Sequence, residues 1–361
     1  VQEGAPIVYQ NGRKLKAQWR VTNNVLQFDV DGYDPAYELI IDPVTRLWGT
    51  YYGGGGSGGA GDDRAMGCVT DASGNVFMAG YTNSSTSTLI ATIGAHQSTN
   101  IGSLYSYDGF LVKFDAHGVR QWGTYCGGLG NDFINACATD PSGNVFVAGN
   151  TNSTTTSNIS TLGSHQSNWN GNSDAFLVKF DNNGLRLWGT YYGGSSNDYG
   201  TACTTDLSGN VYMCGTAGAY ANTIIATPGS HQAAAALSDG YLVKFDANGV
   251  RQWGTYYGAS SAASGGLSPN ACCTDPAGNV VIGGTYFGSA TNTSVATPGS
   301  HQPAFGGTIT SQGSDAFLAK FNSSGVRQWG TYYGSQGNEQ GRVCVADGVG
   351  NIYLSGYAEN N

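Results

Sequence analysis

The chain has 361 residues, 57 of them glycine, and a formal net charge of −9 at pH 7. This much glycine is not expected of a helical protein, and the acidic balance argues against nucleic-acid binding, which needs clustered lysine and arginine. No apolar run approaches the ~20 residues of a membrane-spanning helix. No signal peptide is visible, so we expect the chain to start after processing or inside a longer precursor.

The first 34 residues differ in pattern from the rest of the chain. Residues 6–10 are typical of a strand, and Asn11-Gly12 predicts a tight turn. Residues 17–21 and 25–30 alternate in polarity, as half-buried strands do. We therefore predict an N-terminal β segment over residues 1–34, packing on the main domain or ending an upstream one, and a main domain over 35–361.

A repeat organises the main domain. Two independent markers, the tryptophan of a Trp-Gly-Thr-Tyr motif and an aspartate that follows it, share one register and both occur five times. The tryptophans are Trp48, Trp122, Trp188, Trp253 and Trp329, and the aspartates are Asp71, Asp140, Asp206, Asp275 and Asp347.

Each copy is expected to form four short strands. In the third copy these are residues 175–180, 185–192, 202–205 and 210–214, with turns at Gly184 and Gly209. Short strands joined by glycine turns predict an all-β fold, a β-propeller of four-stranded antiparallel blades. The alternative, a straight solenoid, would need polar capping repeats, and the sequence has none.

The two ends of the repeat array match complementary halves of a copy. Residues 37–41 and 46–52 correspond to the first two strands, and residues 342–346 and 351–355 to the last two. This predicts five blades, with one closing blade shared between the two ends. In the competing interpretation, the chain is cut and more blades follow residue 361.

The eight cysteines do not form a metal-binding pattern. Five of them each precede the repeat aspartate by three residues: Cys68, Cys137, Cys203, Cys272 and Cys344. Equivalent positions on neighbouring blades should lie beyond the ~7 Å at which a disulfide forms, so these five are expected to be small buried apolar residues. Cys126, Cys214 and Cys273 are irregular, and a Cys203–Cys214 pair stays open.

Long loops rich in Ser, Thr and Asn separate the copies, and they contain a recurring Gly-Ser-His-Gln motif. Its histidines, His96, His165, His231 and His301, are expected to hold their own loops by hydrogen bonds, because a propeller rim spaces them too widely for a shared ion.

Other loop residues are candidates for binding. Carboxylates that follow the tryptophan strand are weak Ca²⁺ candidates, although turn formation explains them as well: Asp62, Asp132, Asp198 and Glu339. Irregular aromatic residues are candidates for stacking on sugars, although packing beneath the loops explains them as well: Tyr105, Tyr107, Trp169, Tyr220 and Phe305. We predict no catalytic residue and no cofactor, apart from the weak calcium candidates.

The motifs GSHQ, DAFLVKF, GVRQWGTYYGG and TDxSGNV together resemble the SBBP family of β-propeller repeats. The leading EGAPIVYQ…YELIIDP resembles the end of the conserved domain that precedes such repeats. The resemblance implies a large secreted or surface-exposed bacterial protein, often exported by type IX secretion in the Bacteroidetes. The family name implies seven blades whereas this chain has five copies, so the ring size stays open.

From this we expect a non-enzymatic propeller scaffold for adhesion or extracellular assembly. Its partners would be other surface or extracellular proteins, a second copy of the chain, or glycans, without nucleic acid and without a membrane span. A carbohydrate-binding module is the alternative, and a hydrolase is a third reading that the near-equivalence of the copies disfavours.

Overall fold

The computed structural model describes residues 7–22, 25–42, 47–55, 61–84, 88–103, 105–154, 158–218, 224–235, 238–258, 265–288, 294–307 and 313–359. These residues form strands, turns and loops, with no helix among them, and hence none long and apolar enough to cross a membrane. The chain divides into two compact units, Val1–Tyr51 and Tyr52–Asn361. The division falls later than the boundary expected after residue 34.

The N-terminal unit is one antiparallel sheet with strand order β3-β2-β1-β4. Its strands are β1 (Ile7–Gln10), β2 (Arg13–Thr22), β3 (Val25–Asp31) and β4 (Ile40–Asp42). The tight turn predicted at Asn11-Gly12 is confirmed, since both residues have positive φ, 48° and 74°.

The second unit contains four four-stranded antiparallel sheets, each in consecutive strand order. The first has β5 (Asp63–Thr70), β6 (Val76–Thr82), β7 (Asp108–Phe114) and β8 (Arg120–Cys126). The second has β9 (Asp132–Thr139), β10 (Val145–Thr151), β11 (Asp174–Phe180) and β12 (Arg186–Tyr192). The third has β13 (Asp198–Thr205), β14 (Val211–Ala217), β15 (Asp239–Phe245) and β16 (Arg251–Tyr257). The fourth has β17 (Gly265–Thr274), β18 (Val280–Gly288), β19 (Ser314–Phe321) and β20 (Arg327–Tyr333).

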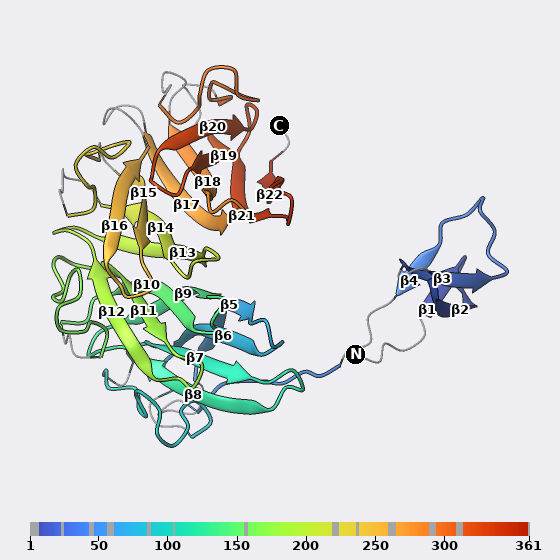
Figure 1. Ribbon diagram of the computed structural model, residues 1–361, viewed down its shortest axis with the longest axis horizontal. Helices are drawn as coiled ribbons and strands as arrows, with labels where there is room; N and C mark the ends of the chain where they lie inside the picture. The colour runs from blue at the N-terminus through green and yellow to red at the C-terminus, as the bar shows by residue number, and fades with distance from the viewer. Residues whose placement is uncertain are drawn as a thin grey trace. The chain divides into compact units, whose positions relative to one another are not determined.

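Each sheet is a propeller blade assembled from two successive sequence copies. The last two strands of one copy form the inner hairpin, and the first two strands of the next copy form the outer hairpin. The strand that carries the repeat cysteine is therefore the innermost. The innermost strands of successive sheets contact one another, and the sheets follow each other along an arc (Figure 1).

The hydrophobic core lies in the junctions between blades. Side chains alternate between the two faces of a strand. On β14, Val211 and Met213 pack toward the preceding sheet, whereas Tyr212 and Cys214 pack toward the following one. Because both faces are covered, central strands such as β11 are buried at every residue. This is the stacking that the repeat predicted.

The fifth blade is only half formed. Its inner hairpin, β21 (Glu339–Ala346) and β22 (Ile352–Ala358), is a two-stranded sheet. The prediction that residues 37–41 would pair with this hairpin in a shared closing blade is wrong for the part that forms a strand, because β4 pairs with β1 instead. Among the described residues, β22 pairs with β21 alone.

Candidate functional site

Pairs of buried carboxylates recur where neighbouring sheets meet. Asp108 begins β7 and Asp132 begins β9 of the next sheet. Both face Gly127, where an added Cβ would lie 2.9 Å from Asp108 Oδ1 and 2.7 Å from Asp132 Oδ2. The same arrangement joins Asp174 to Asp198 around Gly193, and Asp315 to Glu339 around Gly334. Three of the four weak calcium candidates are thus each half of a pair.

The glutamine of the Gly-Ser-His-Gln motif positions the first carboxylate of each pair. Gln97 donates from Nε2 to Asp108 Oδ2 at 2.7 Å and accepts at Oε1 from the Gly127 N–H at 3.0 Å. Its own N–H donates to Thr124 Oγ1 at 3.0 Å. Gln166, Gln232 and Gln302 repeat these three hydrogen bonds. The motif therefore ties its loop to the end of the tryptophan strand.

The second carboxylate of each pair is held by backbone N–H and hydroxyl donors. Asp132 Oδ2 accepts from the Gly128 N–H at 2.7 Å and from Ser153 Oγ at 2.8 Å, and its Oδ1 accepts from Thr151 Oγ1. Asp198 accepts from the Gly194 N–H at 2.7 Å. Such donors stabilise a negative charge, whereas a bound Ca²⁺ would need several oxygen ligands directed at it.

One oxygen of the first carboxylate has no hydrogen-bond partner in the described residues. This holds for Oδ1 of Asp108, Asp174 and Asp315, all of which are fully buried. Burial, reinforced by the charge of Asp132, raises the pKa of Asp108 to about 8. Burial likewise raises the pKa of Asp174 to about 7 and that of Asp315 to about 6. Burial also raises the pKa of Asp132, and that of Asp198 to about 6, so the Asp108–Asp132 and Asp174–Asp198 pairs share a proton more readily than isolated carboxylates do.

No member of these pairs is more than 6% exposed. A paired acid and carboxylate can serve acid–base catalysis only where a substrate reaches both groups. Here both lie inside a junction, so the pairs tie two sheets together and are not available to a substrate.

Two copies of the site lack one carboxylate. Asp239 is held by Gln232 in the usual way, but the copy that follows has Ser260-Ser261-Ala262-Ala263 where the others have an acid, outside the described residues. Asp63 accepts from the Gly54 N–H at 3.0 Å and from Ser84 Oγ at 3.2 Å, as the second carboxylate of a pair. Each carboxylate therefore keeps its usual hydrogen bonds even where the other carboxylate of the pair is missing.

Asp62, the remaining calcium candidate, lies outside these pairs. It forms a 3.0 Å ion pair with Arg64, and Tyr107 donates to it at 3.2 Å. A cationic side chain thus already balances its charge. The described residues contain no group of three or more His, Cys, Asp or Glu side chains placed to hold a metal ion.

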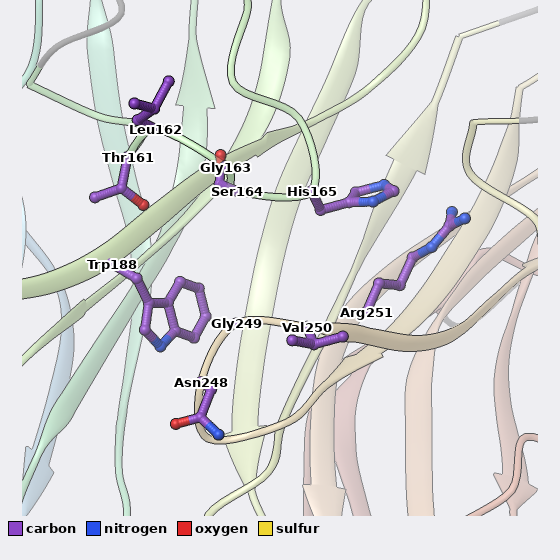
Figure 2. Close-up of a pocket in the computed structure, with 10 residues that line it drawn as sticks. All are labelled: Thr161, Leu162, Gly163, Ser164, His165, Trp188, Asn248, Gly249, Val250 and Arg251. Atoms are coloured by element: carbon purple, nitrogen blue, oxygen red, sulfur yellow. The ribbon is translucent and has the colours of Figure 1, made fainter.

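Clefts recur at three junctions, each lined by a motif loop, a repeat tryptophan and a turn of the next sheet. Figure 2 shows the one of about 390 Å³, with Trp188 and Asn248 at one end and His165 and Arg251 at the other. The Trp188 indole donates to the Ala247 carbonyl at 3.0 Å, and Gly249 packs against the ring. Because Trp188 is only 8% exposed, it offers no open face for a sugar.

The motif histidines hold the junctions chiefly through ring contacts. His165 packs on Tyr192 and on Phe245 of the next sheet, and burial lowers its pKa to about 4. Its Nε2 has no hydrogen-bond partner in the described residues. The hydrogen bond that was expected to hold the loop is therefore not formed by this atom. His96 does form one, because its Nε2 donates to the Asn158 carbonyl oxygen at 3.1 Å.

The aromatic candidates do not gather into one site. Phe305 is 5% exposed against Tyr286 and Tyr332, so its ring is not available for stacking, and that candidate is wrong. Trp169 packs on the core cluster between the first two sheets, and Tyr107 packs on Tyr81 and Phe133. Tyr105 is 85% exposed and stands alone in this set. Tyr220 lies outside the described residues.

The sequence did not single out the motif glutamine or the first carboxylate of each pair. Both recur in every loop-and-strand copy, as the Gln of GSHQ and the Asp of DAFLVKF, and this recurrence was the available signal. The glutamine and the first carboxylate belong to one blade, whereas the two carboxylates of a pair meet only where the third strand of one blade lies against the first strand of the next.

Comparisons with known proteins bear out the resemblance seen in the sequence. Residues 121–154 match the β-propeller repeat SBBP, and residues 1–44 match the domain of unknown function DUF7948. No curated protein matches the chain. Among solved structures, the chain is similar to the rhamnogalacturonan lyase YesW, with 13% sequence identity and a TM-score of 0.37, over 98% of this chain and 69% of the lyase chain.

Proposed function

We propose that this SBBP-type β-propeller repeat chain is a non-enzymatic scaffold that assembles with further copies of itself at the bacterial surface or outside the cell. Its repeated polar groups are engaged in holding blades together, and the two ends of the arc are the faces at which a blade junction is incomplete among the described residues. The secreted location rests on the resemblance to SBBP proteins.

The observation that carries the proposal is the face of the β21–β22 hairpin against which no further sheet of the same unit packs in the described residues. Tyr192 and Tyr257 end the tryptophan strands of inner blades and are fully buried by the next sheet, whereas their equivalent Tyr333 is 60% exposed. Beside it lies a hollow of about 570 Å³ lined by Leu318, Leu354 and Tyr357. Val345, Tyr353 and Val343 are each more than half exposed on β21 and β22.

The other end of the arc carries the matching half of such a junction. In the inner blades, Ile134 and Cys203 of the innermost strands pack against the preceding sheet. Their equivalents on β5, Ala65 and Cys68, are exposed. A second copy therefore fits head to tail, with its β5–β8 sheet against the β21–β22 end of the first. Such a contact closes a ring or extends a filament.

The test uses two charged substitutions, Ala65→Asp at one end and Val345→Asp at the other, followed by sedimentation velocity over a concentration series. We expect the unmodified chain to associate and each variant alone to remain monomeric, because a charge buried in an apolar contact is costly. An equimolar mixture of the two variants should form one-to-one dimers, since each retains one intact end. Leu162→Asp, on an exposed loop, is the matched control and should associate normally.

A chain that stays monomeric up to high concentration would contradict self-assembly. If both variants still associate, the contact between copies lies at another surface. Two variants that fail to complement each other would indicate a symmetric contact in place of the head-to-tail one.

A further inference from the structure

Two neighbouring cysteines on β17 face opposite blades. Cys272 and Cys273 are consecutive, and consecutive side chains of a strand point to opposite faces. Cys272 packs in the core cluster shared with the preceding sheet, where it meets Cys214. Cys273 is therefore directed toward the following sheet, which is the β21–β22 hairpin. In the other copies, the residue after the repeat cysteine is Val69, Ala138, Thr204 or Val345, so this sulfur is a feature of one blade.

Cys344 of β21 lies across this junction from Cys273. The two strands contact each other, and the Cys344 Sγ lies 3.9 Å from the carbonyl oxygen of Val281. Val281 is the residue directly opposite Cys273 in the β17–β18 register. A Cβ added at Gly283 would lie 3.4 Å from the Cys344 Cβ, so Cys344 packs against the backbone of β18 inside the junction. The two thiols are close enough to share a hydrogen bond.

The surroundings make Cys273 the more reactive of the two thiols. Cys273 is partly exposed, whereas Cys344 is 4% exposed. The hydrogen bond from Cys344 lowers the pKa of the Cys273 thiol. Burial and the Asp275 carboxylate act against this effect, and the Lys320 ammonium acts with it. A thiolate that an oxidant can reach, next to a second thiol, is the arrangement in which thiol–disulfide exchange is fast.

We propose that Cys273 and Cys344, which are thiols in this structure, are a disulfide-forming pair that links the fourth blade to the β21–β22 hairpin. The oxidant is a disulfide of the glutathione class. The Cys273 thiolate attacks one of its sulfur atoms, forms a mixed disulfide and releases one thiolate. Cys344 then loses its proton and attacks the Cys273 sulfur, which releases the second thiol. Two cysteine thiols and one disulfide thus give one protein disulfide and two small thiols.

The proposed disulfide does not conflict with the expectation that repeat cysteines on neighbouring blades are too far apart to pair. The repeat cysteines were expected to lie too far apart to pair, and Cys273 is not one of them. Because it follows Cys272 by one residue, it approaches its neighbour from the opposite face. The cross-link joins residues far apart in sequence, so it restricts the unfolded chain strongly.

The experiment treats the folded full chain with oxidised glutathione, quenches with acid, and compares it with chain kept in dithiothreitol. Free thiols are then counted in denaturant, and the unreduced chain is digested with trypsin. We expect the loss of two of the eight thiols. Cleavage after Arg342 yields a peptide whose only cysteine is Cys344, and this peptide should be linked to the one that contains Cys272 and Cys273.

Two variants identify the partner. Cys273→Ser should abolish the link, whereas Cys272→Ser should leave it intact. The midpoint of thermal unfolding should rise by several degrees on oxidation of the unmodified chain, and this rise should vanish in Cys273→Ser and in Cys344→Ser. Retention of all eight thiols in the folded chain would overturn the proposal, as would a link that survives Cys273→Ser.

Discussion

At the scale of single residues, the buried carboxylates couple the stability of the junctions to pH. A carboxyl group whose pKa is higher in the folded than in the unfolded chain binds more protons when folded, so folding stability falls as pH rises between the two values. For Asp108, this window runs from its ordinary value of 3.8 to about 8. The groups with lowered pKa, such as Asp275, act with the opposite sign and at lower pH.

We therefore expect Asp108→Asn to flatten the pH dependence of stability. The unmodified chain should lose free energy of unfolding relative to the variant from about pH 4 to pH 8, by on the order of a few kcal/mol, because Asn cannot ionise beside Asp132. Chemical denaturation at a series of pH values measures the difference. Asp115→Asn, at an exposed carboxylate whose pKa is lowered by backbone N–H groups, is the control and should leave this window unchanged. Parallel profiles for Asp108→Asn and the unmodified chain would refute the shared proton.

The carboxylates also mark where residue-level prediction from sequence ends. Asp132, Asp198 and Glu339 were found as acids at one repeat position, and their burial could not be read from their neighbours in the chain. Their partners belong to the preceding blade, more than 20 residues earlier in each case. Only the stacking of blades brings the two together, so the sequence alone could not show that these acids are buried in pairs.

At the scale of elements, each inner hairpin contains a β-bulge matched by a glycine. On the innermost strand of the third sheet, the register shifts between Gly200 and Ala202. Opposite this shift, a Cβ on Gly215 would lie 1.7 Å from the Tyr199 carbonyl oxygen. Gly80, Gly149, Gly284 and Gly356 meet a carbonyl oxygen in the same way at 1.8 to 2.1 Å. The bulge can form only where the side chain is absent.

Gly215→Ala should accordingly destabilise the chain by at least ~1–3 kcal/mol, because the added methyl group forces the backbone of a packed junction to move. Gly55→Ala is the control, since a Cβ at Gly55 would meet nothing within 4 Å, and it should change stability by less than about 0.5 kcal/mol. The free energy of unfolding from urea titration measures both. Equal effects of the two substitutions would show that the bulge does not exclude a side chain.

The elements themselves were largely predictable, because local chemistry specifies them. The Asp-x-x-Gly turn is one case: Asp140 Oδ1 accepts the N–H groups of Ser142 and Asn144, and Gly143 has a φ of 77°. The sequence alone indicated this hairpin turn and its flanking strands. The bulge was not predicted, because it depends on the register between two strands and leaves only an ordinary glycine in the sequence.

At the scale of the whole molecule, the stacking of blades was predictable and the closure was not. Five near-equivalent amphipathic units imply that each must cover its neighbour, and the core clusters lie in those junctions. The pairing of residues 37–41 was inferred from their likeness to an outer hairpin. In the structure, β4 pairs with β1 at the edge of the N-terminal sheet and not with the β21–β22 hairpin, although its sequence pattern fits either partner.

One part of the first copy nevertheless keeps its repeat contact. The Tyr52 hydroxyl donates to the Ile90 carbonyl at 2.6 Å, as the Tyr192 hydroxyl does to that of Ile225 at 2.6 Å. The end of the first tryptophan segment is thus held against the first blade as Tyr192 and Tyr257 are held against theirs. The part of the half blade that lacks a partner strand among the described residues is therefore the outer edge of β22.

Hydrogen exchange of the β22 amides tests this architecture most directly, at a concentration where sedimentation finds monomer. Strand β18 has a partner on each side, whereas β22 pairs with β21 alone. Amides of residues 352–358 that point away from β21 should exchange far faster than the corresponding amides of residues 280–288. Equal protection of the two strands would contradict the half-formed blade, because it would require a further strand to cover β22.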